Sequence, residues 1–368
     1  MPKVALIFGT RPECIKMAPV IKALEETDGI DVATISSGQH KEMLEQVYRW
    51  FHLAPHEDLS IMRADQTLFD ITTSTLSGLQ RIFAGEKFDL ALVHGDTTTT
   101  LAATLAAFYS GIPVGHVEAG LRTYTYQAPW PEEMNRHVVD HVAALHFAPT
   151  ELARQHLVQE HIPEEGIFLT GNTVIDALLT VVEPEYRFPD PRLASLDGRV
   201  LLITAHRRES FGAPLEAAFH AILDIVEAEP DLTAVYPVHR NPHVLEPAHR
   251  ILGGHPRIRL IEPLDYKDFS NLMARCTLIL SDSGGVQEEA PTLGKPVLVL
   301  REVTERPEAL DAGTARLVGC DRERIVATAL TLLRDSCEYD KMAKAANPFG
   351  DGTAGKKIAQ IVKQFLCS

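Results

Sequence analysis

Short apolar runs alternate with longer segments of helical composition from the start of the chain. Val4–Phe8, Val32–Ile35, Phe88–Val93 and Ile112–Val117 are each followed by a polar turn that leads toward a helical segment. Continuous apolar runs separated by helices are typical of parallel strands that are buried on both faces. The first part of the chain therefore predicts a doubly wound α/β domain.

The same alternation restarts after a stretch with three prolines, residues 184–198, which we interpret as an interdomain linker. The strand predicted at Val200–Thr204 begins the second series of strands and helices. The sequence thus predicts an α/β fold with two doubly wound, Rossmann-like parallel-sheet domains facing a cleft, over residues 1–183 and 199–346.

The turn after the first strand carries positive charge. Gly9–Glu13 lacks the G-x-G-x-x-G pattern of a dinucleotide site, and Pro12 suits the first turn of a helix. Arg11 and Lys16 are candidate ligands for an anion at this strand end. A solvated helix start is the alternative interpretation.

A glycine-containing turn in the second half predicts a phosphate site. Ser283, Gly284 and Gly285 follow the apolar run Thr277–Leu280 and open a segment of helical composition. Glycines let the backbone approach a ligand closely, and free N–H groups at a helix start favour an anion. Glu289, one turn further, is placed to accept both hydroxyls of a ribose. An ordinary tight strand-to-helix turn is the alternative.

Acidic side chains occur at the ends of predicted elements. Asp96 and Glu118 each follow an apolar strand, and Glu132 lies at a predicted helix start. Open α/β sheets bind ligands at the carboxyl ends of their strands, although helix dipoles alone also favour acids at helix starts. His206, which is followed by two arginines at another strand end, is the histidine that we place among the catalytic candidates.

Composition narrows the class of protein. The 368 residues carry a formal charge of −15, which argues against nucleic acid as a partner. Any anionic ligand would therefore have to be bound by local Arg and Lys side chains and backbone N–H groups. The five cysteines are scattered along the chain without C-x-x-C spacing. No signal peptide is recognisable, and no apolar run approaches the ~20 residues that a membrane span requires. We expect a cytoplasmic protein that does not enter a membrane.

The order of the motifs resembles that of the non-hydrolysing UDP-N-acetylglucosamine 2-epimerases, over essentially the whole chain. The motifs that carry the resemblance are Gly9–Glu13 with Lys16, His94–Thr100, Gly115–Thr123, Pro131–Glu133, Gly171–Asp176, His206–Ser210, Ser283–Glu289 and Thr304–Glu308. Each motif alone is weakly specific, whereas the set in this order is highly specific. The resemblance implies a glycosyltransferase-B architecture, a homodimer, and a last helix, 353–368, that joins the first domain.

The resemblance also implies the ligands, which are UDP-N-acetylglucosamine and UDP-N-acetylmannosamine, with no metal and no cofactor. The phosphates and ribose of UDP would meet Arg11, His206, Ser283, Gly284, Gly285 and Glu289. The uracil would lie near Leu264 and Phe269, and the sugar would lie nearer Lys16, Asp96, Glu118 and Arg306. A second, activating UDP-N-acetylglucosamine is implied at Gln39, His40, Arg207 and His239.

The chemistry of such a reaction limits the mechanism. Inversion at C2 breaks a C–H bond that lies beside an acetamido nitrogen and not beside a carbonyl, so this proton is not acidic. Oxidation by a nicotinamide would solve the problem, but the dinucleotide fingerprint is absent. The other route expels UDP from C1 while C2 loses its proton, and the resemblance implies the resulting glycal intermediate. This route needs an acid and a base on opposite faces of the sugar ring. Asp96, Glu118 and Glu132 are the candidates, and which of them is the acid and which the base is left open. The route also needs hydrogen-bond donors, such as His206, that hold the departing diphosphate.

Other functions are compatible with these motifs. A glycosyltransferase of the same architecture would share the phosphate site, and a sensor would bind a sugar nucleotide without turnover. Among epimerases, the alternatives are a diacetamido-uronic acid sugar nucleotide as substrate, or hydrolytic release of free N-acetylmannosamine.

Overall fold

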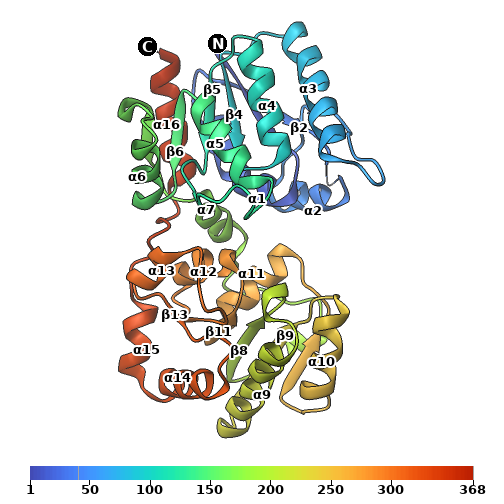
Figure 1. Cartoon of the computed structure of the whole chain (residues 1–368), viewed down its shortest axis with the longest axis vertical. Helices are drawn as coiled ribbons and strands as arrows, with labels where there is room; N and C mark the ends of the chain where they lie inside the picture. Colours follow the sequence, from blue (N-terminus) through green and yellow to red (C-terminus); the bar gives the residue numbers. More distant parts are fainter. Residues whose placement is uncertain (40, 368) are drawn as a thin grey trace. The chain divides into compact units, whose positions relative to one another are not determined.

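The computed structural model describes residues 1–39 and 41–367. The chain divides into two compact units, Met1–Thr180 with Phe349–Ser368, and Val181–Pro348 (Figure 1). The predicted domain limits stay a prediction. Within the described part of the chain, no helix has both the length and the apolar character needed to cross a membrane.

The first unit is built on a seven-stranded parallel sheet with the order β3-β2-β1-β4-β5-β6-β7. Its strands are β1 (Lys3–Phe8), β2 (Asp31–Ser36), β3 (Glu57–Asp58), β4 (Leu90–His94), β5 (Val114–Val117), β6 (Leu145–Ala148) and β7 (Ile167–Leu169). The strand order reverses between β1 and β4. The carboxyl ends of these two strands therefore flank the switch point, where open α/β sheets bind ligands.

The helices of this unit include one from the end of the chain. They are α1 (Arg11–Glu25), α2 (Lys41–Phe51), α3 (Leu68–Gly85), α4 (Thr98–Tyr109), α5 (Glu132–Val142), α6 (Glu151–Gln159), η1 (Glu164–Gly166), α7 (Thr173–Val181) and α16 (Ala354–Cys367). The helix α16, red in Figure 1, packs against α1. A Cβ at Gly355 would lie 2.8 Å from the carbonyl oxygen of Pro19, so glycine allows this close contact.

The second unit repeats the architecture with a six-stranded parallel sheet in the order β10-β9-β8-β11-β12-β13. Its strands are β8 (Arg199–Thr204), β9 (Leu232–Pro237), β10 (Ile258–Ile261), β11 (Leu278–Ser281), β12 (Val297–Val299) and β13 (Ala315–Leu317). Its helices are α8 (Pro191–Ala194), η2 (Arg208–Ser210), α9 (Ala213–Ala228), α10 (Pro242–Leu252), α11 (Tyr266–Arg275), α12 (Gly284–Glu289), η3 (Ala290–Leu293), α13 (Pro307–Asp311), α14 (Arg322–Arg334) and α15 (Ser336–Ala343). The switch point lies between β8 and β11. The prediction of two doubly wound parallel sheets is confirmed.

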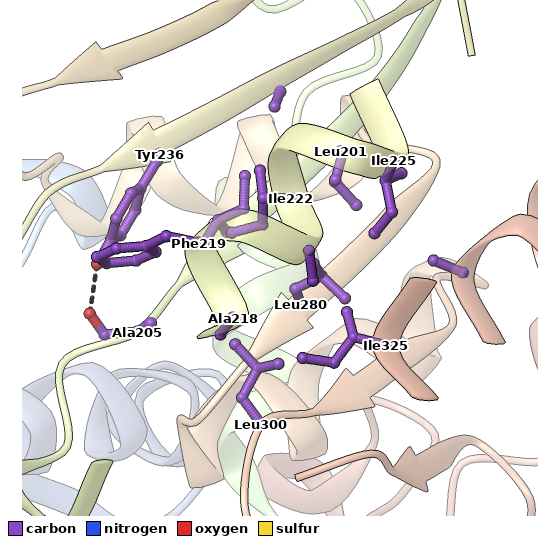
Figure 2. Close-up of a cluster of buried hydrophobic side chains, with 14 of the residues drawn as sticks. Leu201, Ala205, Ala218, Phe219, Ile222, Ile225, Tyr236, Leu280, Leu300 and Ile325 are labelled. Atoms are coloured by element: carbon purple, nitrogen blue, oxygen red, sulfur yellow. Dashed lines mark hydrogen bonds between the residues drawn. The ribbon is translucent and has the colours of Figure 1, made fainter. Parts of the chain in front are cut away.

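The core of the second unit packs α9 against the sheet (Figure 2). Phe219 and Ile222 of α9 are fully buried and lie with Leu201 of β8, Leu280 of β11 and Ile325 of α14 in one apolar cluster. Side chains of this kind on both a helix and the strands hold the two layers together. The strand ends that carry the polar residues are thereby fixed to a rigid support.

Several elements of the structure are not recognisable in the sequence, because they are short or depend on tertiary contacts. Two of these, β3 and β13, have two and three residues and pair with only one neighbouring strand each, β2 and β12. The single turn α8 lies inside the stretch interpreted as a linker. The helices α10, α13 and α15 are also absent from the predicted elements. None of these short pieces has an apolar run long enough to be recognised alone.

Tyr236 gives a test of how this core supports the strand end that precedes His206. Its buried hydroxyl donates a hydrogen bond to the carbonyl oxygen of Ala205 at 2.5 Å, which is dashed in Figure 2. Tyr236→Phe removes this donor and should lower the free energy of unfolding by about 1–2 kcal/mol. Chemical denaturation measures the loss. Tyr109→Phe, at a tyrosine that is 72% exposed, is the control and should change stability by less than about 0.5 kcal/mol; equal losses in both variants would contradict this assignment.

Candidate functional site

A buried carboxylate joins the two turns that flank the switch point of the first sheet. Glu13 is 2% exposed, and its Oε2 accepts hydrogen bonds from the backbone N–H groups of Gly9 and Thr10 at 3.1 and 2.7 Å. Its Oε1 accepts from the hydroxyls of Thr97 and Thr100 at 2.7 and 2.9 Å. Burial raises the pKa of Glu13, and these hydrogen bonds oppose the rise. The carboxylate of Glu13 therefore links the turn after β1 to the turn after β4 by hydrogen bonds.

Glu118 lies at the end of β5 in a strained backbone conformation. Its φ is +67°, in the left-handed region, and strain of this kind clusters at functional sites. Its Oε1 is paired with Nζ of Lys16 and accepts a hydrogen bond from Nδ2 of Asn172 at 3.0 Å. Two residues that the sequence analysis selected separately, Lys16 and Glu118, thus form one ion pair.

His94, the last residue of β4, lies against this ion pair. Its Nε2 is 3.5 Å from Oε2 of Glu118. Burial lowers the pKa of His94 to about 3, and the charge of Glu118 opposes only part of this effect. The imidazole is neutral at neutral pH and adds no charge to the cluster. Among the described residues, neither ring nitrogen has a hydrogen-bond partner.

Asp96 is held by a second cation. Its Oδ2 pairs with Nη2 of Arg136 at 2.5 Å, and Nη1 of Arg136 donates to Glu133 at 3.1 Å. Glu133 is fully buried and accepts from the backbone N–H groups of Thr123 and Tyr124 at 2.9 and 2.7 Å. Burial opposes ionisation of Glu133, but these N–H groups and Arg136 hold its pKa below the usual range. Arg136 therefore connects Asp96 to the loop that begins at Thr123.

Two further predicted residues lie at helix starts of the same unit. Arg11 is the first residue of α1 and Glu132 is the first residue of α5, and both are half-buried. Glu133, the next residue after Glu132, is the one that the fold buries. The two neighbouring acids therefore differ, since Glu133 supports the loop while Glu132 remains accessible for chemistry.

A third buried carboxylate supports the end of β5. Asp140 is fully buried, pairs with Nδ1 of His116 at 2.5 Å and Nη2 of Arg122 at 2.7 Å, and accepts from the N–H of Gly120 at 3.2 Å. Nε2 of His116 lies 2.7 Å from the carbonyl oxygen of Gly95. Both partners of the ring are acceptors, so both ring nitrogens must donate. Burial raises the pKa of Asp140, but the charges of His116 and Arg122 outweigh burial and hold it well below its usual value.

The second unit has a cavity of about 250 Å³ at the carboxyl ends of β8, β9 and β11. Its lining includes six residues that the sequence analysis assigned to UDP, namely His206, Leu264, Phe269, Ser283, Gly285 and Glu289. Pro237, Pro263 and Val286 add apolar surface to the side chains of Leu264 and Phe269. The cavity thus has an apolar wall for a flat ring, together with polar groups.

Gly284 and Gly285 open α12 beside this cavity. A Cβ at either position would have no neighbour closer than 3.9 Å, and both residues have negative φ. Neither packing nor backbone conformation therefore requires glycine here. The close approach of a ligand to the backbone is the remaining physical reason for two glycines.

Charged side chains surround this turn. Arg306 is paired with Glu288, and its guanidinium would be the nearest group to a Cβ at Gly284, at 3.9 Å. Glu289 is 7% exposed, and its Oε1 accepts a hydrogen bond from the hydroxyl of Tyr266 at 2.8 Å. Burial and the charge of Glu289 raise the pKa of Tyr266, so the hydroxyl stays a donor.

His206 is positioned by a carboxylate and a second ring. It stacks on His239 with ring centroids 5.6 Å apart and an angle of 14° between the planes. Oδ2 of Asp282 accepts from the backbone N–H groups of His206 and Arg207 at 2.5 and 2.7 Å, and Oδ1 lies 3.2 Å from Nδ1 of His206. Asp282 therefore spans the switch point of the second sheet, as Glu13 does in the first.

The residues implied for an activating ligand are divided between the two units. Gln39 accepts a hydrogen bond from Oγ1 of Thr99 at 3.0 Å in the first unit. Arg207 and His239 belong to the second unit, where His239 lines the cavity already described. His40 lies outside the described residues. The activating site stays a prediction.

The sequence analysis did not identify the buried acids that support the site. Glu13 and Thr10 have the spacing of a capping box, which is visible in the sequence. Asp282 comes two residues after the predicted strand Thr277–Leu280, and this position could have suggested a role. Asp140 carries no such signal, because it lies inside a helix.

A family model described as UDP-N-acetylglucosamine 2-epimerase matches residues 22–363. The chain belongs to the UDP-N-acetylglucosamine 2-epimerase family. The UDP-N-acetylglucosamine 2-epimerase of Salmonella typhimurium (strain LT2) is 52% identical over 375 residues and is matched over 100% of both chains. The family resemblance found from the motifs is confirmed.

Solved structures agree with this membership of the epimerase family. The crystal structure of UDP-GlcNAc 2-epimerase from Neisseria meningitidis bound to UDP-GlcNAc has 46% identity and a TM-score of 0.87, covering 98% of this chain and 100% of that chain. The glycotransferase of kitacinnamycin has 11% identity and a TM-score of 0.67 over 100% of both chains, a likeness that concerns the fold alone. The two parallel α/β units are thus of the glycosyltransferase-B-like type.

His94 gives a pH test of the cluster around Glu118. Unfolded histidine titrates near 6.5, whereas burial lowers the pKa of His94 to about 3. Between these values the unfolded chain binds the extra proton, so the stability contributed by neutral His94 is full above pH 6.5 and is lost as the pH falls. From pH 7 to pH 5.5, the unmodified protein should lose about 1 kcal/mol more unfolding free energy than His94→Gln. Denaturation curves at the two pH values measure this difference, and parallel losses in both proteins would refute it.

Proposed function

We propose that the chain interconverts UDP-N-acetylglucosamine and UDP-N-acetylmannosamine by inverting C2, without hydrolysis and through a glycal intermediate. The observation that carries this proposal is the pair of strand-end carboxylates, Asp96 and Glu118, each paired with a cation, in a member of the epimerase family. Carboxylates that are fixed in place and reachable by a ligand are suited to proton transfer.

The cavity of the second unit suits a uridine diphosphate. Leu264 and Phe269 offer an apolar wall for the uracil, and Glu289 offers a carboxylate for the ribose hydroxyls. The N–H groups of 283–285 and the ring of His206 would hold the phosphates. The related structure from Neisseria meningitidis is bound to UDP-GlcNAc, which supports this choice of ligand.

Arg11, Lys16 and Arg306 complete the proposed contacts. Lys16 pairs with the carboxylate of Glu118 and would face the sugar, while Arg11 at the start of α1 would add positive charge for the diphosphate. Arg306 lies over the glycine turn, where its charge would offset the charge that develops on the leaving group.

The reaction proceeds by elimination and re-addition. One carboxylate takes the proton from C2, and the electron pair of the C–H bond forms the C1=C2 double bond. The C1–O bond breaks at the same time, and its electron pair leaves with the β-phosphate of UDP. A carboxylic acid then gives a proton to the opposite face of C2, and the phosphate oxygen attacks C1. Asp96, Glu118 and Glu132 carry these proton transfers, and His206 donates to the departing phosphate. Atoms and electrons balance without an oxidant.

The location, oligomeric state and regulation of the enzyme are also proposed. We place it in the cytoplasm as a homodimer, with a second UDP-N-acetylglucosamine bound as an activator at Gln39, His40, Arg207 and His239. All five cysteines are free, which fits a reducing compartment.

Incubation of UDP-N-acetylglucosamine alone in D₂O tests the reaction class. The proposal predicts deuterium at C2 of both sugar nucleotides, because the proton taken from C2 exchanges with solvent before re-addition. Mass spectrometry and proton NMR measure the label and identify the products. A requirement for an acceptor would indicate a glycosyltransferase, and free N-acetylmannosamine as the product would indicate hydrolysis. Either result would overturn the proposal.

Substitution of the three acids tests their roles. Asp96→Asn, Glu118→Gln and Glu132→Gln should each lower kcat by ~10²–10⁴, because each variant lacks a proton-transfer group. Calorimetry should find UDP affinity nearly unchanged, since none of the three acids is a proposed nucleotide contact. Glu185→Gln, at an exposed acid, is the control and should keep full activity. Normal turnover in all three variants would exclude these carboxylates from the chemistry.

A further inference from the structure

Asp282 is a buried carboxylate with a fixed orientation. It is 1% exposed and follows β11, whereas His206 follows the adjacent strand β8. The backbone N–H groups of His206 and Arg207 both donate to Oδ2, so the carboxylate has little freedom to turn. The N–H of Asp282 donates to the carbonyl oxygen of Thr204 at 3.0 Å, which joins the two strand ends further.

The second oxygen of Asp282 lacks a complete hydrogen bond. Oδ1 lies 3.2 Å from Nδ1 of His206, but the ring is turned so that the contact does not have hydrogen-bond geometry, and no other described residue donates to Oδ1. A buried carboxylate oxygen without a donor is costly. The side chain of His206 is 41% exposed and has room to rotate toward Asp282. A donor at Nδ1 would remove this cost.

The neighbours of His206 limit the directions that its ring can take. The ring of His206 stacks on the ring of His239, and Nδ1 of His239 accepts the N–H of Asn241 at 3.1 Å. Glu289 and His239 line the same cavity as His206. When Nδ1 of His206 faces Asp282, Nε2 on the opposite side of the ring is directed away from the carboxylate.

We propose that Asp282 is a positioning residue that accepts a hydrogen bond from Nδ1–H of His206, so that Nε2–H of the same doubly protonated ring faces the diphosphate of the nucleotide. This inference rests on the proposed function, in which His206 donates to the departing phosphate. In that doubly protonated form the ring donates at both nitrogens, to Asp282 through Nδ1 and to the phosphate through Nε2. Asp282 itself does not contact the ligand.

Asp282→Asn changes the proton arrangement with little change in shape. The two backbone N–H groups require the amide oxygen of the new residue to take the place of Oδ2, so its NH₂ group must face Nδ1 of His206. Nδ1 then has to accept, so the ring holds a single proton, on Nε2, and is a neutral and therefore weaker donor to the phosphate. The same change of tautomer follows in serine proteases when the aspartate of the catalytic triad is replaced by asparagine.

Nitrogen-15 NMR of the histidine side chains tests this directly in the full chain with UDP bound. His206→Gln assigns the signal by its loss. We expect a protonated Nδ1 in the unmodified protein and an unprotonated Nδ1 in Asp282→Asn. Asp335→Asn is the matched control, because Asp335 also accepts two backbone N–H groups, those of Cys337 and Glu338, and should leave the His206 signal unchanged. An unprotonated Nδ1 in the unmodified protein would overturn the proposal.

A double-mutant cycle separates positioning from a purely structural role. Asp282→Asn should lower kcat about 10–100-fold with a much smaller change in KM. In a His206→Gln background the same change should cost less than about threefold, because the residue that it positions is gone. Equal losses in both backgrounds would show that Asp282 acts only through the backbone, and would refute the proposal. The NMR result does not depend on turnover, so a failure of the epimerase assignment is distinguishable from a failure of this one.

Discussion

One buried carboxylate spans the switch point of each parallel sheet, and the site depends on these two contacts. Parallel strands deliver their polar turns to the same edge, where backbone N–H groups beyond the end of the strand pairing need another acceptor. A carboxylate has two oxygens and therefore serves two turns at once. Glu13 joins the turns after β1 and β4, and Asp282 joins the turns after β8 and β11.

One group of acids, Glu13 and Asp282, has different partners from a second group, Asp96 and Glu118. Glu13 and Asp282 accept hydrogen bonds from backbone N–H groups or hydroxyls, so the cost of burying each is offset by neutral donors. Asp96 and Glu118 are instead paired with the flexible cations Arg136 and Lys16. A ligand can compete for a lysine or arginine more readily than for a backbone turn. The first group therefore holds the shape of the site, and the second group is suited to chemistry.

The fold could be read from the sequence because apolar runs with helices between them have few alternatives to a parallel sheet. The strand β1 was located from the apolar run Val4–Phe8, whereas β13 has three residues and pairs with β12 alone. The glycine turn at 283–285 was recognisable because glycine has a direct physical meaning at a strand end. The role of Asp140 could not be predicted, since an acid inside a helix usually faces solvent and its contact with His116 is purely tertiary.

Reversible loss of UDP from C1 is the step that these groups would serve. UDP-N-acetylglucosamine with ¹⁸O in the bridge between C1 and the β-phosphorus tests that step directly. If the C1–O bond breaks and re-forms, rotation of the β-phosphate should move the label into non-bridging positions, at a rate comparable with epimerisation, as followed by phosphorus NMR. Epimerisation with the label retained wholly in the bridge would contradict elimination and re-addition.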